Sequence, residues 1–303
     1  MKYCPFLVLL LMVACFNLLS CDDEEDHFSR KGDYDEIADK AVMAVARINS
    51  PGKGNYTTPE EGMATYGDTV VIFNSSGYYR MFNIYGNSRL GYKFHSISNG
   101  ELASFRKDNH ANNAFFSDEF YEEGDALPLL YVSSWQRPQR CFVERWNGKG
   151  FEHVQTITYS PSVNPRYYSN FAFDRDRRLL YNINYRSVHK SDELHVASFA
   201  MPSFKSDSVV LDETQAADTF TLKFPMPQTW QGVYIHEDEM FILYGGGTGV
   251  RGFYKVDLST HDFVNYDFTP HFDVEPEALA YFNHSLIMNT NGAAIFYLYR
   301  FNR

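Results

Sequence analysis

Cysteine is scarce in this sequence. The 303 residues include four cysteines, and three of them lie at the N-terminus, at Cys4, Cys15 and Cys21. Beyond residue 21 only Cys141 remains, so a disulfide within the chain would need one of those three as its partner. The sequence therefore predicts no disulfide framework and no metal site built from several cysteines.

Basic residues are also few. The chain has 27 Lys and Arg against 38 Asp and Glu, which gives a formal net charge of −11 with histidine neutral. Binding to nucleic acid requires a basic surface that neutralises phosphates, so we expect no nucleic-acid partner. The same balance disfavours an anionic polysaccharide, although a local basic patch would override it.

One apolar run stands out, at residues 6–16, where it follows the positive charge of Lys2. Its length is typical of a signal peptide and too short to cross roughly 30 Å of hydrocarbon as a helix. The run closes with residues 18–21, Leu-Leu-Ser-Cys, which resemble a bacterial lipobox. The resemblance implies that residues 1–20 are a lipoprotein signal peptide and that acylated Cys21, carrying chains such as palmitate, anchors the protein to a lipid bilayer. The alternative is an ordinary signal peptide with an incidental cysteine.

Five acidic residues, Asp-Asp-Glu-Glu-Asp at 22–26, follow the cysteine directly. Such a run repels itself and indicates a solvated spacer, so residues 21–36 are assigned as the lipidated cysteine and an acidic linker. The run also resembles the export signal of Bacteroidetes lipoproteins, which implies an outer-membrane protein facing the cell surface. Aspartate directly after the cysteine would suggest inner-membrane retention under the enterobacterial rule, and a periplasm-facing protein remains the alternative.

Helical patterns are nearly absent from residues 37–303, which we assign as one domain. Short apolar or aromatic runs recur instead, separated by turn clusters such as Tyr66-Gly67-Asp68 and Asn291-Gly292. The 22 Tyr and 26 Phe of the chain suit strands with bulky flat faces. The sequence therefore predicts an all-β domain.

The strands belong to a repeat of 46 to 61 residues. Each copy reads as a polar residue, a short strand, a turn and a strongly apolar strand, as at residues 61–73 and 231–243. The copies begin at Glu61, Asn113, Asn170, Gln231 and Glu277. This spacing suits four-stranded blades, so we expect a single β-propeller of five blades.

The last copy has room for only three strands after Glu277. Propellers commonly close by taking a strand from the other end of the chain, and residues 40–48 are the candidate. Closure would remove a free sheet edge. Four or six blades remain possible because the loops are uneven, and a β-sandwich is the main competing fold.

The five starting residues are all polar and should surround one mouth of the central channel. Glu275, His110 and Trp230 lie close to them in the sequence and are added to the set. Carboxylates and carboxamides together suit a hard divalent cation, Ca²⁺ or Mg²⁺, or the hydroxyl groups of a sugar. The alternative without a ligand is a hydrated channel whose polar residues hold water or cap strand ends. We expect Trp230 to pack in the structure rather than to stack on a ligand.

Several segments resemble a group of five-bladed propellers that includes teichoic-acid-biosynthesis-C-like domains and phage receptor-binding domains. They are Gln231-Gly232, the strand at residues 253–258 and Glu275-Pro276-Glu277. The copies that begin at Asn113 and Asn170 lack the Gln/Glu-Gly start, so the ring is not uniform. The resemblance implies binding of a glycan or cell-surface component more than a defined reaction.

We therefore expect a membrane-anchored, extracytoplasmic propeller that binds a ligand, foremost carbohydrate. One alternative is a metal-dependent hydrolase or glycosidase using Glu61, Glu275 and Glu277, whose carboxylates would have to converge. Another is a protein-protein scaffold of an outer-membrane assembly, which would need an exposed apolar patch.

Overall fold

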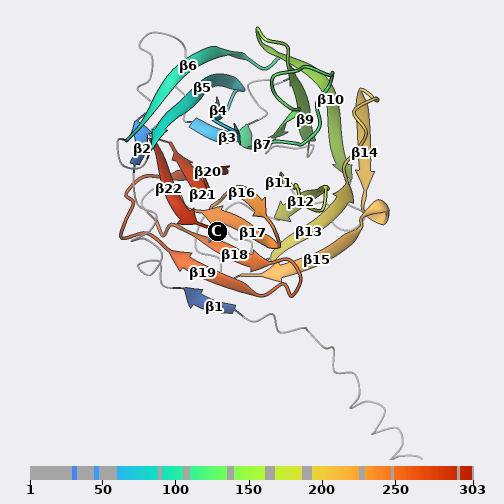
Figure 1. Cartoon of the computed structure of the whole chain (residues 1–303). Helices are drawn as coiled ribbons and strands as arrows, with labels where there is room; N and C mark the ends of the chain where they lie inside the picture. The colour runs from blue at the N-terminus through green and yellow to red at the C-terminus, as the bar shows by residue number, and fades with distance from the viewer. Residues whose placement is uncertain are drawn as a thin grey trace, which may run out of the picture.

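Five small sheets, each built on four antiparallel strands, stand around a central axis in the computed structural model, as the blades of a propeller (Figure 1). The structure describes residues 29–32, 44–47, 60–87, 91–104, 110–134, 140–160, 168–185, 193–224, 229–246, 249–291 and 294–301. The predicted signal peptide, Cys21 and the acidic run lie outside these residues. The expectation of an all-β fold with five four-stranded blades is confirmed.

The first three blades follow one another along the chain. Blade one contains β3 (Glu60–Tyr66), β4 (Thr69–Asn74), β5 (Tyr78–Asn87) and β6 (Gly91–Glu101). Blade two contains β7 (Ala111–Phe116), β8 (Leu130–Ser134), β9 (Arg140–Trp146) and β10 (Phe151–Ser160). Blade three contains β11 (Tyr168–Asp174), β12 (Leu179–Tyr185), β13 (Glu193–Ala200) and β15 (Asp218–Lys223).

The fourth and fifth blades complete the ring. Blade four contains β16 (Trp230–His236), β17 (Glu239–Tyr244), β18 (Gly252–Asp257) and β19 (Phe263–Asp267). Blade five contains β20 (Pro276–Phe282), β21 (Ser285–Thr290) and β22 (Ala294–Arg300). Its outer strand is β2 (Ala44–Arg47), which pairs antiparallel with β22. Residues 40–48, proposed from the sequence to close the ring, contain this strand.

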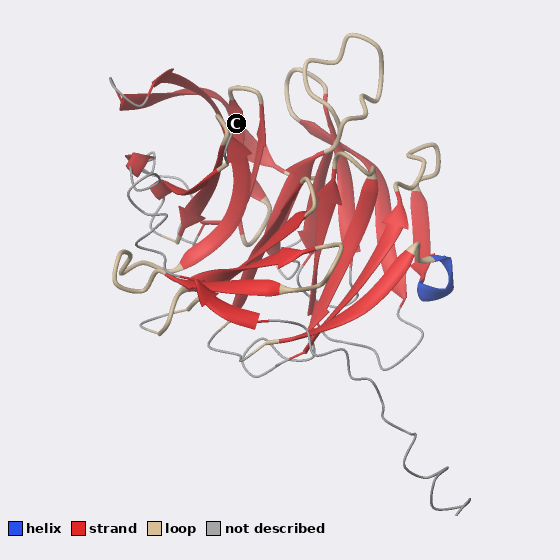
Figure 2. Ribbon diagram, turned by 60° about the horizontal axis from the view of Figure 1, so that its bottom comes forward, coloured by secondary structure: helices blue, strands red, loops and turns tan. Residues whose placement is uncertain are grey.

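Two blades carry a fifth strand that the repeat did not predict. β1 (Ser29–Gly32), from the segment assigned as linker, pairs in parallel with β19 on the outside of blade four. β14 (Ser208–Asp212) leaves blade three after β13 and pairs in parallel with β10 of blade two. This excursion lengthens the third repeat. It ends in the one helical turn of the described residues, η1 (Glu213–Gln215), which Asp212 caps (Figure 2).

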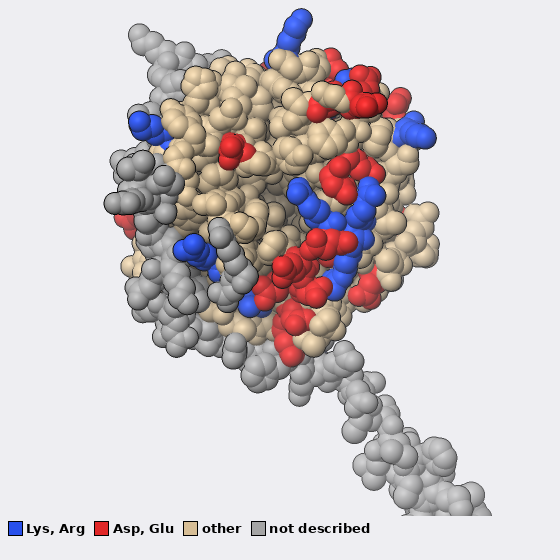
Figure 3. All heavy atoms as spheres, viewed as in Figure 1, with Lys and Arg blue, Asp and Glu red and all other residues tan. Residues whose placement is uncertain are grey.

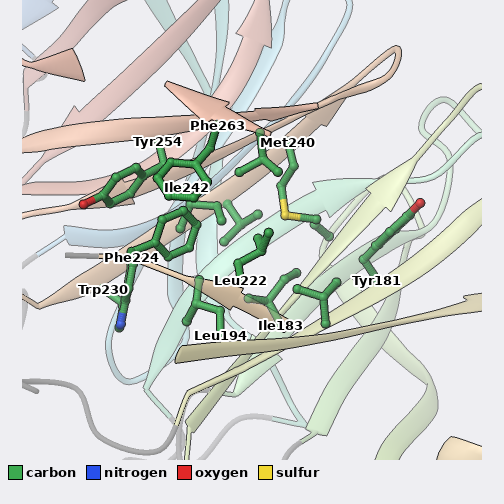
Figure 4. Packing of buried hydrophobic residues seen from close by; sticks show 14 of the residues in the cluster. Tyr181, Ile183, Leu194, Leu222, Phe224, Trp230, Met240, Ile242, Tyr254 and Phe263 are labelled. Atoms are coloured by element: carbon green, nitrogen blue, oxygen red, sulfur yellow. The ribbon is translucent and has the colours of Figure 1, made fainter. Parts of the chain in front are cut away.

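The middle strands are apolar on both faces because each blade is covered by a blade on either side. In β21, Leu286 and Met288 pack against blade four, whereas Ile287 packs against blade one. Hydrophobic clusters of the described residues fill all five interfaces between blades. Figure 4 shows the cluster between blades three and four, where Met240 and Ile242 meet Leu194 and Leu222. Burying each such side chain contributes roughly 1.5–3 kcal/mol.

Steric contact explains why glycine follows Gln or Glu at the start of these repeat copies. A Cβ atom on Gly232 would lie 2.6 Å from the Cα of Ala278 on the neighbouring inner strand. On Gly62 it would lie 3.0 Å from the carbonyl oxygen of Ala111. Glycine at these positions lets the inner strands of adjacent blades approach each other closely near the axis.

Candidate functional site

The innermost strand of each blade is β3, β7, β11, β16 or β20, and these strands line the central channel (Figure 1). Their first residues gather at one end of the channel, which we call the amino end. Their last residues and the turns that follow gather at the other, which we call the hairpin end. The two ends differ in chemistry.

Carboxamides at the amino end tie the inner strands to one another. Asn113 of blade two donates to the carbonyl oxygens of Phe171 and Val233, at 2.8 and 3.0 Å, and accepts from the Val233 amide at 3.3 Å. Its side chain thus joins blades two, three and four. Asn170 donates to the carbonyl oxygen of Gln231 at 2.8 Å, and the Gln231 side chain donates to that of Gly245 at 3.0 Å. The buried Asn113 and Asn170 thus satisfy backbone polar atoms of other blades, and Gln231 satisfies one of its own blade.

Two further asparagines at the amino end were not singled out from the sequence. Asn289 of β21 donates to the carbonyl oxygen of Glu61 at 2.9 Å and accepts from the Ala278 amide at 2.8 Å. Asn112 lies 3.4 Å from the Asn170 side chain. Both are buried. Neither stands at the repeat position that identified the others, which is why the repeat did not find them.

The titratable residues predicted for this mouth also come together. Glu61 and Glu277 are buried and hydrogen-bonded to each other, and Glu61 lies 3.2 Å from Nε2 of His110. Burial, followed by the charges of Glu61 and Glu275, raises the pKa of Glu277 well above its ordinary value. Glu277 is therefore held as the protonated partner of the pair. Glu275 is joined to the ring through Gln231, whose Nε2 lies 3.4 Å from its Oε1.

This arrangement limits the chemistry of the pair. Hydrogen-bonded carboxyl groups are closer than the separation of about 5–5.5 Å found in retaining glycosidases or about 6.5–9.5 Å in inverting ones. Within the described part of the chain, no three His, Cys, Asp or Glu residues are arranged to hold a metal ion.

Trp230 lies away from the channel. Its side chain is 1 % exposed and packs between blades three and four against Phe224, Tyr254 and Tyr185 (Figure 4). The apolar indole is held in this interface, so it is not presented to a ligand at the channel mouth.

The hairpin end opens into a cavity of about 810 Å³. All five blades line it, and nine of the lining side chains are aromatic: Tyr66, Tyr85, Tyr92, Phe115, Phe116, Phe173, Tyr234, Tyr281 and Phe282. Small residues leave the space open, since Ala64, Ala114 and Ala280 stand on three of the inner strands. A volume of this size suits a small molecule or a few sugar units.

Polar groups surround the aromatic lining. Thr65, Asp68, Arg175, Asp176, Glu237 and Asn283 line the cavity at or near the turns of four blades. His236 stacks on Tyr281 with ring centroids 4.9 Å apart, and burial lowers the pKa of His236. The cavity thus combines flat apolar surfaces with hydrogen-bonding groups at its rim.

No protein-family model and no curated protein matches the sequence. Among solved structures, the chain is similar to a catalytically inactive virginiamycin B lyase from Staphylococcus aureus, crystallised with quinupristin. The identity is 9 %, the TM-score is 0.42, and the match covers 84 % of this chain and 97 % of that one. The site must therefore be interpreted from its own residues.

The sequence placed its candidate residues at the amino end, whereas the cavity lies at the hairpin end. In three of the five copies an aromatic residue stands five positions after the start: Tyr66 after Glu61, His236 after Gln231 and Phe282 after Glu277. Asp118 and Arg175 stand at that position in the other two copies. The starting residue of each copy stood out in the sequence because it is polar in all five. Aromatic residues near the ends of the inner strands, Phe116 and Phe173 in the copies that begin at Asn113 and Asn170, were the signal that could have identified the cavity.

No helix among the described residues is long and apolar enough to cross a membrane.

Proposed function

We propose that this protein is an extracytoplasmic, ligand-binding propeller that captures carbohydrate in the hairpin-end cavity. The observation that supports this proposal is the aromatic lining of the cavity. The flat faces of sugar rings carry C–H groups that pack on tyrosine and phenylalanine, while their hydroxyl groups need polar partners. The cavity offers both, with Tyr66 and Tyr281 half-buried and Tyr85 at 52 % exposure.

Polar side chains at the rim would give the site its selectivity. Most small-molecule sites place a few polar groups around an apolar surface, and these groups fix the orientation of the ligand. Thr65 and Asn283 offer neutral hydrogen-bonding groups, and Arg175 and Asp176 offer charged ones. A sugar bound here would exchange water at the rim for these partners.

The proposal places the domain at the outer membrane, held by lipid on Cys21 and facing the cell surface. The lipobox and the acidic run support this placement. The residues between Cys21 and β1 would then separate the membrane from the propeller. An anchored binding domain of this kind would concentrate a glycan at the cell surface.

The residues at the amino end support the alternative of a hydrolase or glycosidase less well than the cavity supports ligand binding. The carboxamides at this end are engaged by backbone groups, and its two closest carboxyl groups share a hydrogen bond. We therefore assign this end to holding the ring together.

The test is calorimetric titration of the full chain, purified in detergent, with a panel of neutral, amine-bearing and acidic oligosaccharides. At least one oligosaccharide should bind, and Tyr66→Ala should weaken its binding. Tyr121→Ala is the control, because Tyr121 is a surface tyrosine that lies outside the cavity lining. Binding that survives Tyr66→Ala but is lost on Glu277→Gln would move the site to the amino end. No binding by any member of the panel would overturn the proposal and favour a protein-protein scaffold.

A further inference from the structure

The charges around the cavity identify the class of carbohydrate, provided that the hairpin-end cavity is the binding site. We infer that the ligand carries a cationic amine, as in a glycan with unsubstituted amino sugars. Three carboxylates at the mouth and an aromatic wall with several tyrosines support this inference.

The three carboxylates approach the mouth from different blades. Asp68 lies in the turn between β3 and β4, Asp176 between β11 and β12, and Glu237 between β16 and β17. All three are exposed, and none forms an ion pair with another described residue. Among the described residues of the lining, Arg175 is the single Lys or Arg, so carboxylates outnumber cations in this set by three to one.

Three other basic residues near the turns that follow the inner strands pair with carboxylates outside the cavity. Arg177 lies 2.5 Å from Asp238, Arg178 lies 2.7 Å from Glu119, and Lys255 lies 2.6 Å from Glu239. Figure 3 shows basic and acidic side chains interleaved on one side of the hollow at the centre of the ring. Because these three cations are paired with other carboxylates, they do not neutralise the carboxylates of the cavity lining.

The aromatic wall favours the same ligand. A cation over the face of a tyrosine is attracted by the negative charge density of the ring face. Tyrosines at 66, 85, 92, 234 and 281 line the cavity from blades one, four and five. Burial lowers the pKa of His236, which disfavours a positive charge on this ring. An ammonium group would therefore meet π-faces inside the cavity and carboxylates at its rim.

An acidic sugar would meet the opposite conditions. Its carboxylate would approach Asp68, Asp176 and Glu237, with Arg175 as the one cation among the described lining residues, in a chain whose net charge is −11. An N-acetylated sugar would keep the stacking surface but lose the charge. The site should therefore rank the free amine first and the acidic sugar last.

The test compares three oligosaccharides of equal length by calorimetry on the full chain: glucosamine, N-acetylglucosamine and uronic-acid oligomers. The pH is set where the amines are protonated. The glucosamine oligomer should bind about tenfold more tightly than the N-acetylated one, and added salt should reduce this difference. Asp176→Asn and Glu237→Gln should each reduce it too. Asp238→Asn is the control, because Asp238 pairs with Arg177 and does not line the cavity.

Equal or tighter binding of the N-acetylated oligomer would overturn the inference and leave carbohydrate binding intact. Tighter binding of the acidic oligomer would overturn it as well. A difference that Asp238→Asn reduces as much as Glu237→Gln would assign the effect to the general field of this face and not to the cavity, which also contradicts the inference. Failure of every oligosaccharide to bind would instead count against the proposed function.

Discussion

The carboxyl group of Glu277 donates a hydrogen bond to Glu61 across the interface where the last blade meets the first. The bond requires one proton for two buried carboxyl groups. It lies on the inner strands β20 and β3, beside the point where the ring closes. Ionisation of both groups would place two like charges together at that interface.

This pair predicts a loss of stability as the pH rises. Because the pKa of Glu277 in the folded protein is raised above its ordinary value of 4.5, the folded state retains a proton that the unfolded state releases. The stabilisation is fully present below pH 4.5 and is lost as the pH rises through the folded pKa. Thermal unfolding across this range should show it. Glu277→Gln, which keeps a donor to Glu61, should flatten this part of the profile, and an unchanged profile would contradict the assignment.

Asn113 is expected to be the most costly amino-end carboxamide to remove. Its side chain makes three hydrogen bonds to the backbones of two other blades, and it is completely buried. Asn113→Ala leaves those backbone groups without partners, so it should lower the free energy of unfolding by about 2–4 kcal/mol. Urea denaturation measures this change. The control is Asn83→Ala at an exposed site, with an expected change within about 0.5 kcal/mol, and similar losses for the two variants would contradict the role of Asn113.

Gly232→Ala tests the close approach of the inner strands. The new Cβ would lie 2.6 Å from the Cα of Ala278, and backbone at that distance cannot move away as a side chain would. The substitution should lower the free energy of unfolding by about 1–3 kcal/mol. Gly150→Ala is the matched control, because its nearest neighbour would be 3.7 Å away. Equal unfolding free energies for the two variants would show that the strands separate without cost.

These positions show how much of the molecule followed from its sequence. The repeat located all five inner strands, and the missing strand of its last copy pointed to residues 40–48, which contain the closing strand β2. It did not predict β1 or β14, which add to outer edges where the partner is set by tertiary structure. It also could not tell a polar residue that binds a ligand from one such as Asn113, which binds backbone across the axis.

The proposed lipid anchor is tested separately from the propeller. Cys21→Ser should abolish incorporation of a labelled fatty acid and release the protein from the membrane fraction, because the lipobox chemistry requires the thiol. Replacing the acidic run at 22–26 with alanines should leave acylation intact but remove the protein from the cell surface, as measured by protease treatment of whole cells. Acylation of Cys21→Ser would refute the lipid anchor, and unchanged surface exposure of the second variant would refute the export role of the run.

Tyr85 offers the cleanest separation of binding from stability. Its ring lines the cavity yet is 52 % exposed, so Tyr85→Ala should change the free energy of unfolding by less than about 0.5 kcal/mol. Losing one stacking surface is worth about 0.5–1.5 kcal/mol, so affinity for the bound oligosaccharide should fall by up to about tenfold in calorimetric titration. Tyr85→Phe retains the ring and should bind nearly as well as the natural protein. If Tyr85→Phe instead loses as much affinity as Tyr85→Ala, the hydroxyl group and not the ring face holds the ligand, and the argument from aromatic stacking fails at this residue.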